Sequence, residues 1–359
     1  MSGSLFRQGG RYRTRKTGPH EYTMKIPLPG DQEGRTAREC PRPDCSPGYF
    51  KVKFGTGITE AQSLAFCPYC RRSADPGDFA TREQARYAKD IMMREAHEGI
   101  ERMMKDALGL GSSGRRKLGG GLFSIEMSYK PGTRPHVRRP FEEELQRAVV
   151  CPNCGLDHAV FGLATWCPDC GGDIFMTHVD AEHGVIRKML GDVERRRTDF
   201  GARIAARDIE NCLEDTVSVF EAVLKALVVR HLRENGTAED EVHEILRKRI
   251  RNSFQNVHRA QTVAEKVLGV PLFAAAEVEV TSRLAGTFEK RHPITHNLGV
   301  VDRKYVENAL SAEREGREIR VTVDEVEEAM KASLELLTSF HAKLFPGQEP
   351  DQCGKPEDE

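Results

Sequence analysis

Residues 151–171 read CPNCGLDHAVFGLATWCPDCG and contain two Cys-Pro-x-Cys pairs, each followed by glycine, with twelve residues between the pairs. The two-residue gap inside a pair lets both thiolates face one ion, and the following glycine supplies the conformation that closes the turn. Backbone amides of such a turn donate hydrogen bonds to the sulfurs. The spacing therefore predicts a zinc ribbon of two short hairpins with four ligands, Cys151, Cys154, Cys167 and Cys170.

Two other interpretations of this segment stay open. His158 lies between the pairs and is able to replace a cysteine as ligand, although a surface position is the simpler expectation. Thiol–disulfide exchange also uses Cys-x-x-Cys, but thioredoxin-type motifs do not come as matched double pairs. Because four thiolates close the coordination shell, we expect a structural zinc and no catalytic metal.

A second group of cysteines precedes the ribbon and is less regular. Four residues separate Cys40 from Cys45, whereas two separate Cys67 from Cys70. We expect these four to form a second structural zinc site. The alternatives are ligands shared between the two groups and a degenerate site. Ten cysteines in a chain without a secretory signal indicate metal binding in a reducing cytosol rather than disulfides.

The composition is that of a soluble protein with a strongly charged surface. Of 359 residues, 38% are hydrophobic and 30% are charged, and the net charge is −1. No apolar run approaches the ~18 residues that a membrane span needs, and the N-terminus lacks the apolar core of a secretory signal. We therefore expect a cytoplasmic protein that binds no membrane. Residues 1–30 hold six Lys and Arg against only Glu21, which suits either an arm that lies along phosphates or a disordered tail.

The rest of the chain has mainly helical patterns. Two capping boxes, Thr81 with Gln84 and Thr322 with Glu325, predict the starts of two helices. The first box precedes residues 82–108, which are rich in helix formers. The other expected elements are a strand in 124–132, a long helix with an apolar stripe from Ile209 to Leu227, helices at about 239–268 and 274–290, and a helix capped by Asp302.

These patterns predict an α+β protein, mainly α, in which small four-cysteine zinc ribbons with short β-hairpins precede a C-terminal helical bundle. The expected segments are a basic flexible arm (1–30), an N-terminal zinc-binding region with one helix (31–108), a Gly-rich flexible linker (109–121), a zinc ribbon (122–178), a helical domain (179–346) and a tail (347–359).

Late in the helical domain the chain reads Arg291-His292-Pro293-Ile294-Thr295-His296, followed by NLGVVDRKY up to Tyr305. This stretch resembles the signature of HEPN domains, which are helical and carry an arginine, a polar residue, three further residues and a histidine. The bare spacing also occurs by chance, at Arg15 and His20. The position in an all-helical domain, the polar second residue and the Asn-x-Gly-Val-Val-Asp continuation favour 291–296. The resemblance covers about residues 180–345.

The resemblance implies a dimeric, metal-independent endoribonuclease with RNA as its substrate. Arg291 and His296 match the two key positions, and His292 matches the polar position as a secondary contact or a helix cap. The motifs of two protomers would meet across the interface, where His296 of each acts as base or acid and Arg291 stabilises the charge on the phosphorane. The product would be a 2′,3′-cyclic phosphate. Asn297 is a further candidate RNA contact that is also placed to hold the turn. Arg303 and Lys304 are candidate contacts to the RNA backbone, although a solvated helix face is the simpler explanation for such charges.

The resemblance further implies a toxin or anti-phage role, a neutralising or regulatory protein partner, and zinc segments that are an accessory module. Helix geometry makes the site feasible. Residues five apart on a straight helix point ~140° apart, but Pro293 favours the first helical position. His292 would then lie near the cap, and Arg291 just outside it would swing toward His296 at the positive end of the helix, where phosphate binds.

Two other functions fit the sequence. One is a binding adaptor, in which the zinc ribbons and basic segments recognise nucleic acid or a protein while the helical domain only dimerises. The other is a nucleotide-binding or nucleotide-transferring regulator. The segment GLGSSGRRKLGGG (109–121) lacks the Gly-Lys-Ser/Thr ending of a P-loop, so it is better interpreted as a linker.

Overall fold

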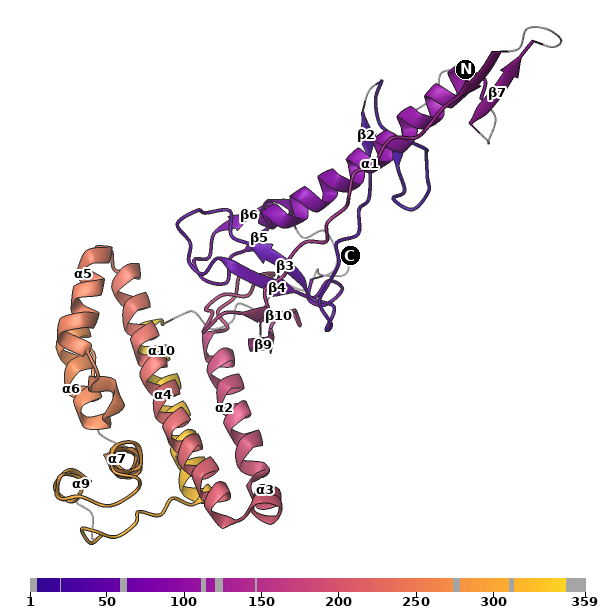
Figure 1. Ribbon diagram of the computed structural model, residues 1–359. Coiled ribbons are helices and arrows are strands. Elements are labelled where there is room, and N and C mark those ends of the chain that lie inside the picture. The colour runs from indigo at the N-terminus through magenta and orange to yellow at the C-terminus, as the bar shows by residue number, and fades with distance from the viewer. Residues whose placement is uncertain are drawn as a thin grey trace, which may run out of the picture. The chain divides into compact units, whose positions relative to one another are not determined.

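Figure 1 shows a computed structural model of the chain, which describes residues 5–19, 21–58, 63–110, 114–119, 125–145, 147–273, 278–309 and 313–346. The chain divides into two compact units. Unit 1 comprises Met1–Val150 and Gly155–Phe161, and unit 2 comprises Cys151–Cys154 and Gly162–Glu359. The expected linker and the start of the expected ribbon therefore fall inside unit 1, and the expected tail lies outside the described residues.

A four-stranded antiparallel sheet organises unit 1. Its order is β3 (Thr36–Glu39), β4 (Tyr49–Val52), β10 (Asp157–Val160) and β9 (Arg147–Val150). The two central strands are far apart in the sequence and pair with Val52 opposite His158. Phe50 of β4 is buried and meets Phe79 edge-on, with ring centroids 5.9 Å apart. The N-terminal zinc-binding region (31–108) and the zinc ribbon (122–178), which the sequence predicts as separate segments, thus contribute strands to one sheet with one core.

The long helix of unit 1, α1 (Arg82–Ala107), begins at the predicted capping box. The Thr81 hydroxyl accepts from the Gln84 amide, and the Gln84 side chain accepts from the Thr81 amide. Gln84 Nε2 also donates to the Ala37 carbonyl at 2.9 Å, which fixes the start of the helix to β3. The predicted helix over 82–108 is confirmed.

The segments expected to be a flexible arm and a flexible linker form hairpins in their described parts. The pairs are β1 (Arg15–Lys16) with β2 (Tyr22–Thr23), and β7 (Arg115–Leu118) with β8 (Ile125–Ser128), which confirms the strand predicted in 124–132. Tyr12 is only 4% exposed, and its hydroxyl accepts from Arg94 of α1. Aromatic and backbone groups of the arm pack on α1, a partner that composition does not reveal.

Unit 2 is helical, with α4 (Ala202–Glu234) packed against α2 (Phe175–Gly191), α3 (Val193–Phe200) and α10 (Val323–Leu344) (Figure 1). The apolar stripe predicted from Ile209 to Leu227 is buried on α4 and forms the centre of the core. The remaining helices are α5 (Glu239–Glu244), α6 (Val257–Leu268), α7 (Val278–Glu289), α8 (Arg291–His296) and α9 (Arg303–Ala309). The predicted caps hold: Asp302 accepts from the Tyr305 amide, and Thr322 and Glu325 form their box.

One predicted helix is broken. The span 239–268 contains α5, a π-helical turn (Ile245–Ile250), a 3₁₀ turn (Ser253–Gln255) and α6. Arg251 adopts a φ of 48°, and Asn256 accepts from the Arg259 amide to start α6 anew. Asn and Ser side chains offer the backbone alternatives to helical hydrogen bonds, so the polar run after Ile250 ends the helix. Within the described ranges, no helix combines the length and apolar character of a membrane span.

Candidate functional site

The cysteines gather in the two groups that the sequence predicts. In each group the four sulfurs lie within 4.8 Å of one another, and each group could hold a metal ion. The first group unites the loop between β3 and β4 with the turn between β5 (Ala65–Phe66) and β6 (Ser73–Ala74). No ligand is shared between the groups, so the alternative of exchanged ligands was wrong for these eight residues. The groups are Cys40, Cys45, Cys67 and Cys70, and Cys151, Cys154, Cys167 and Cys170.

Two of the turns that carry these cysteines, at residues 67–70 and 167–170, share a backbone hydrogen bond and a left-handed residue after the second cysteine. The Gly171 amide donates to the Cys167 carbonyl at 3.0 Å, and the Arg71 amide donates to the Cys67 carbonyl at the same distance. Gly171 has a φ of 67°, and Arg71 has a φ of 59° in the left-handed region that favours glycine. The Asp169 amide donates to the Cys167 sulfur at 3.4 Å, as predicted for such turns.

His158 is neither a metal ligand nor a surface residue. It lies on β10, is 0% exposed, and its Nδ1 is 3.3 Å from the Leu156 carbonyl oxygen. The expectation of a surface position was wrong because β10 is an interior strand, flanked on both sides by β4 and β9. Only its place between two cysteine pairs had suggested a role at the metal.

A buried ion pair links the turn at residues 167–170, in the second cysteine group, to the helices of unit 2. Asp173 accepts from Arg230 of α4 at 2.7 Å, and His341 of α10 lies 3.3 Å from the same carboxylate. The Arg230 guanidinium also lies over the rings of Trp166 and Phe345. Burial opposes the charge of Asp173, but the hydrogen bond from His341 and the charge of Arg230 lower its carboxyl pKa below the usual value. Sequence analysis missed this cluster, whose members lie far apart in the chain.

The Arg–His motif occupies α8, and its start differs from the expected geometry. The helix begins at Arg291 rather than at Pro293, and Lys290 before it is already in the right-handed helical region. Only Lys290 therefore separates α8 from the end of α7, and Arg291 lies inside the helix rather than beyond its cap. The predicted phosphate site at an open helix start is not formed.

The two histidines of the motif lie side by side one turn apart. The ring centroids of His292 and His296 are 5.2 Å apart, with the planes tilted by 53°. His296 is exposed, whereas His292 is partly covered and its Nε2 lies 3.5 Å from Asp302 Oδ2. Asp302 also caps α9 by accepting from the Tyr305 amide at 2.7 Å. The carboxylate therefore restrains one imidazole and leaves the other in solvent.

Arg291 belongs to a polar network with Gln255 and Glu221. Its Nη1 donates to Gln255 Oε1 at 3.0 Å, and Gln255 Nε2 donates to Glu221 Oε2 at 2.8 Å. The Arg291 Nε is buried and meets no acceptor among the described residues, which also show no hydrogen bond between Arg291 and His296. Gln255 and Glu221 were not predicted, because no local pattern marks residues from a 3₁₀ turn and a separate helix as partners of Arg291.

The other predicted RNA contacts differ in their surroundings. Asn297 Nδ2 donates to the Val300 carbonyl at 2.6 Å, so this side chain holds the turn after α8. Arg303 is exposed and paired with Glu307, and Lys304 is exposed. Leu298, next to Asn297, is 84% exposed with a φ of 52°, a conformation that costs a leucine about 1 kcal/mol or more.

A scan against protein-family models gives no match, and neither a curated protein nor a solved structure matches the chain.

Proposed function

We propose that unit 2 is a metal-independent endoribonuclease of the HEPN type, with His296 and Arg291 as its catalytic residues. One observation carries the proposal: two imidazoles lie 5.2 Å apart on a short helix that also carries Arg291, whose Nε meets no acceptor among the described residues. Acid–base cleavage of RNA needs these groups and no metal.

The chemistry balances without a cofactor. A neutral imidazole takes the proton of the ribose 2′-hydroxyl, whose oxygen then bonds to phosphorus. The bond from phosphorus to the 5′-oxygen breaks, and a protonated imidazole gives its proton to that leaving oxygen. A guanidinium stabilises the charge on the equatorial oxygens. The products are a 2′,3′-cyclic phosphate and a 5′-hydroxyl.

We further propose that a homodimer completes the site. Within one protomer, Arg291 donates to Gln255 rather than to His296, and in the proposed dimer the motif of the second protomer brings a guanidinium and an imidazole to one phosphate. Leu298 supports this arrangement, because a strained, exposed leucine beside the motif is an apolar group for a partner to cover. The toxin or anti-phage role stays a prediction.

We propose that both metals are zinc. Two sulfur pairs of the first group are each 3.7 Å apart, and two pairs of the second group are 3.6 and 3.8 Å apart. Four sulfurs bound at ~2.3 Å in a tetrahedron are about 3.8 Å apart, so the donor set fits tetrahedral zinc thiolate. A closed shell of this kind stabilises the fold and leaves the acid–base steps to the histidines.

The test is cleavage of an end-labelled single-stranded RNA in buffer without divalent cations. His296→Phe should lower the rate by a factor of about 10²–10⁴, and Arg291→Gln by about 10²–10³. The matched control is His243→Phe, at an exposed histidine on α5, which should leave the rate unchanged. Undiminished cleavage by folded His296→Phe would refute the nuclease, and RNA binding without cleavage by the wild type would favour the adaptor.

The dimer is tested separately by sedimentation. Leu298→Asn removes the apolar group and relieves the left-handed strain, because asparagine tolerates this region. We expect a protein that is as stable or more stable, with weaker self-association and a lower rate at low protein concentration. A wild type that is active as a monomer would contradict the composite site.

A further inference from the structure

Charge is divided unevenly between the two units. Unit 1 holds 27 Lys and Arg against 19 Asp and Glu, whereas unit 2 holds 27 against 36. A net charge of −1 therefore combines a basic unit of +8 with an acidic unit of −9. The field of unit 1 attracts a polyanion, and that of unit 2 repels it.

The units also differ in how their exposed cations are paired. On unit 2, Arg195 pairs with Asp192 and Asp199, and Arg203 and Arg207 pair with Glu210. On unit 1, several exposed cations form no ion pair with another described residue, and they include Arg11, Arg13, Arg15, Arg115 and Arg138. An unpaired guanidinium keeps its charge and its five N–H donors for a ligand.

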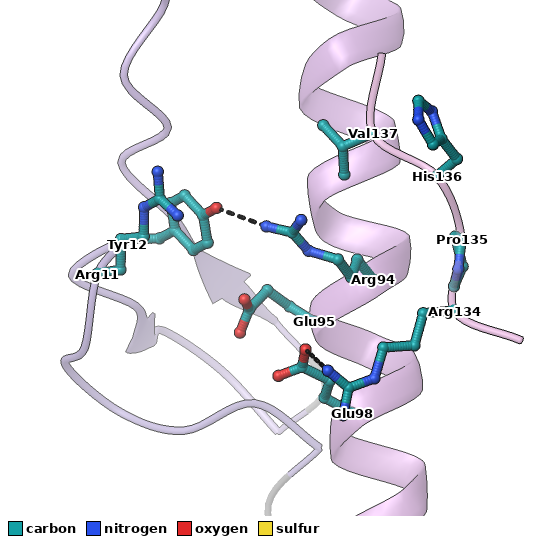
Figure 2. Close-up of a pocket in the computed structure, with 9 residues that line it drawn as sticks. All are labelled: Arg11, Tyr12, Arg94, Glu95, Glu98, Arg134, Pro135, His136 and Val137. Carbon is teal, nitrogen blue, oxygen red and sulfur yellow. Dashed lines mark hydrogen bonds and ion pairs between the residues drawn. The ribbon is translucent and has the colours of Figure 1, made fainter. Parts of the chain in front are cut away.

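Arginines of unit 1 converge on a pocket of about 590 Å³. Figure 2 shows α1 with Arg94, Glu95 and Glu98 between two other segments, the N-terminal loop with Arg11 and Tyr12, and the stretch 134–137. The pocket therefore gathers groups that lie more than a hundred residues apart in the sequence.

Tyr12 orients two of these arginines without neutralising them. Its hydroxyl accepts from Arg94 Nη2 at 3.2 Å, and the Arg11 guanidinium lies 5.6 Å from its ring centroid (Figure 2). Neither Arg11 nor Arg94 pairs with a carboxylate among the described residues. Arg134 is 3.5 Å from Glu98 in an exposed, weak pair that a ligand is able to replace.

The charges of the lining select the class of anion. Three arginines against Glu95 and Glu98 leave one positive charge in excess. That matches a phosphodiester, which carries one negative charge, better than the dianion of a phosphate monoester. A recess with chain on both sides suits a flexible strand rather than the convex backbone of a duplex.

We propose that this pocket binds one phosphodiester of a single-stranded nucleic acid, whose neighbouring phosphates contact the exposed cations of unit 1. The site is separate from the Arg–His motif and does not require that motif to be catalytic. Single-stranded DNA is a suitable probe, because it lacks the 2′-hydroxyl and cannot undergo the proposed cleavage.

The experiment measures binding of labelled single-stranded DNA and RNA to the full chain by fluorescence anisotropy as a function of salt. Arg11→Gln/Arg94→Gln should weaken binding uniformly across sequences and reduce the slope of log K against log salt by about 1.4, since each lost contact contributes about 0.7. The matched control is Arg86→Gln/Lys105→Gln. It also removes two positive charges from unit 1, but at cations of α1 that are already paired with carboxylates of the same helix. Arg11→Gln alone, at an exposed position, serves if the double variant does not fold.

Equal losses in both double variants would show that net charge, and not the pocket, governs binding, and would overturn the proposal. So would tighter binding of a duplex, or binding of phosphatidylserine vesicles but not of either strand. DNA binding that survives His296→Phe but is lost in Arg11→Gln/Arg94→Gln would establish the pocket whether or not the protein cleaves RNA.

Discussion

His183 is a buried residue that the core holds in its neutral form. It lies on α2 with 0% exposure, and neither ring nitrogen has a hydrogen-bond partner among the described residues. Burial, together with the charge of Arg187, lowers the pKa of His183 from 6.5 to about 4, and Asp180 opposes the shift. The unfolded chain therefore binds a proton between these pH values that the folded chain does not.

This difference predicts a loss of stability as the pH falls. Above pH 6.5 the histidine is neutral in both states and does not lower the free energy of unfolding. As the pH falls from 6.5 to 4, the free energy of unfolding decreases by about 3 kcal/mol at most, because only the unfolded chain takes up the proton. We expect His183→Leu to match or exceed the wild type at pH 7.5 and to lose less stability by pH 4.5. Urea unfolding at several pH values measures the difference, which cancels the acid lability of the metal sites common to both proteins. Parallel pH curves would show that His183 is protonated or hydrated in the folded state.

At the scale of elements, the contact between the N-terminal arm and α1 depends on a missing side chain. A Cβ added at Gly99 of α1 would lie 1.7 Å from the Leu5 carbonyl oxygen, and the Arg102 side chain donates to that same oxygen at 3.4 Å. Backbone cannot give way as a flexible side chain does. Gly99 is thus a position where the arm backbone lies too close to the helix for a side chain.

Gly99→Ala should release the arm although alanine is the better helix former. In an open helical position the exchange gains about 0.5–1 kcal/mol, and Gly286→Ala on α7, where the new Cβ would meet no atom within 4 Å apart from its chain neighbours and the surrounding helix backbone, is the matched control. We expect faster tryptic cleavage at Arg11 and Arg13 in Gly99→Ala, and weaker DNA binding if the pocket acts as proposed. Unchanged cleavage in the folded variant would mean that the arm does not pack against α1.

Local spacing predicted some elements and could not predict others. The cysteine pairs and both capping boxes were found because the two members of each pair or box lie three to five positions apart in the sequence. The pairing of β4 with β10 and the hydrogen bond from Arg291 to Gln255 join segments that are distant in the sequence. Local hydrophobic periodicity therefore does not predict them. The break after Ile250 was missed because the polar residues that end the helix there are equally compatible with an exposed helix face.

For the whole molecule, each unit contains one cysteine group, and the two groups support different structures. The first group joins two loops of unit 1 beside its sheet. The last cysteine of the second group, Cys170, lies three residues before Asp173. The buried ion pair of Asp173 with Arg230 connects the turn at residues 167–170 to α4. Removing one partner of a buried ion pair costs about 3–5 kcal/mol, so displacement of this turn should reach the helical core, whereas loss of the first metal should not.

Single ligand substitutions separate these effects. With one zinc ion in each cysteine group, as proposed, Cys70→Ser should lose one of the two ions and unfold unit 1 while unit 2 keeps most of the helical signal at 222 nm, because most described helices belong to that unit. Cys170→Ser should also lose one ion, but should lower the melting temperature of the helices. Cys212→Ala is the matched control, since this buried cysteine of α4 belongs to neither group and its loss should release no zinc. Zinc release is measured with a colorimetric chelator and melting by circular dichroism. If both serine variants melted alike, the pair between Asp173 and Arg230 would not transmit metal loss to the helices, and the two units would depend on their metals in the same way.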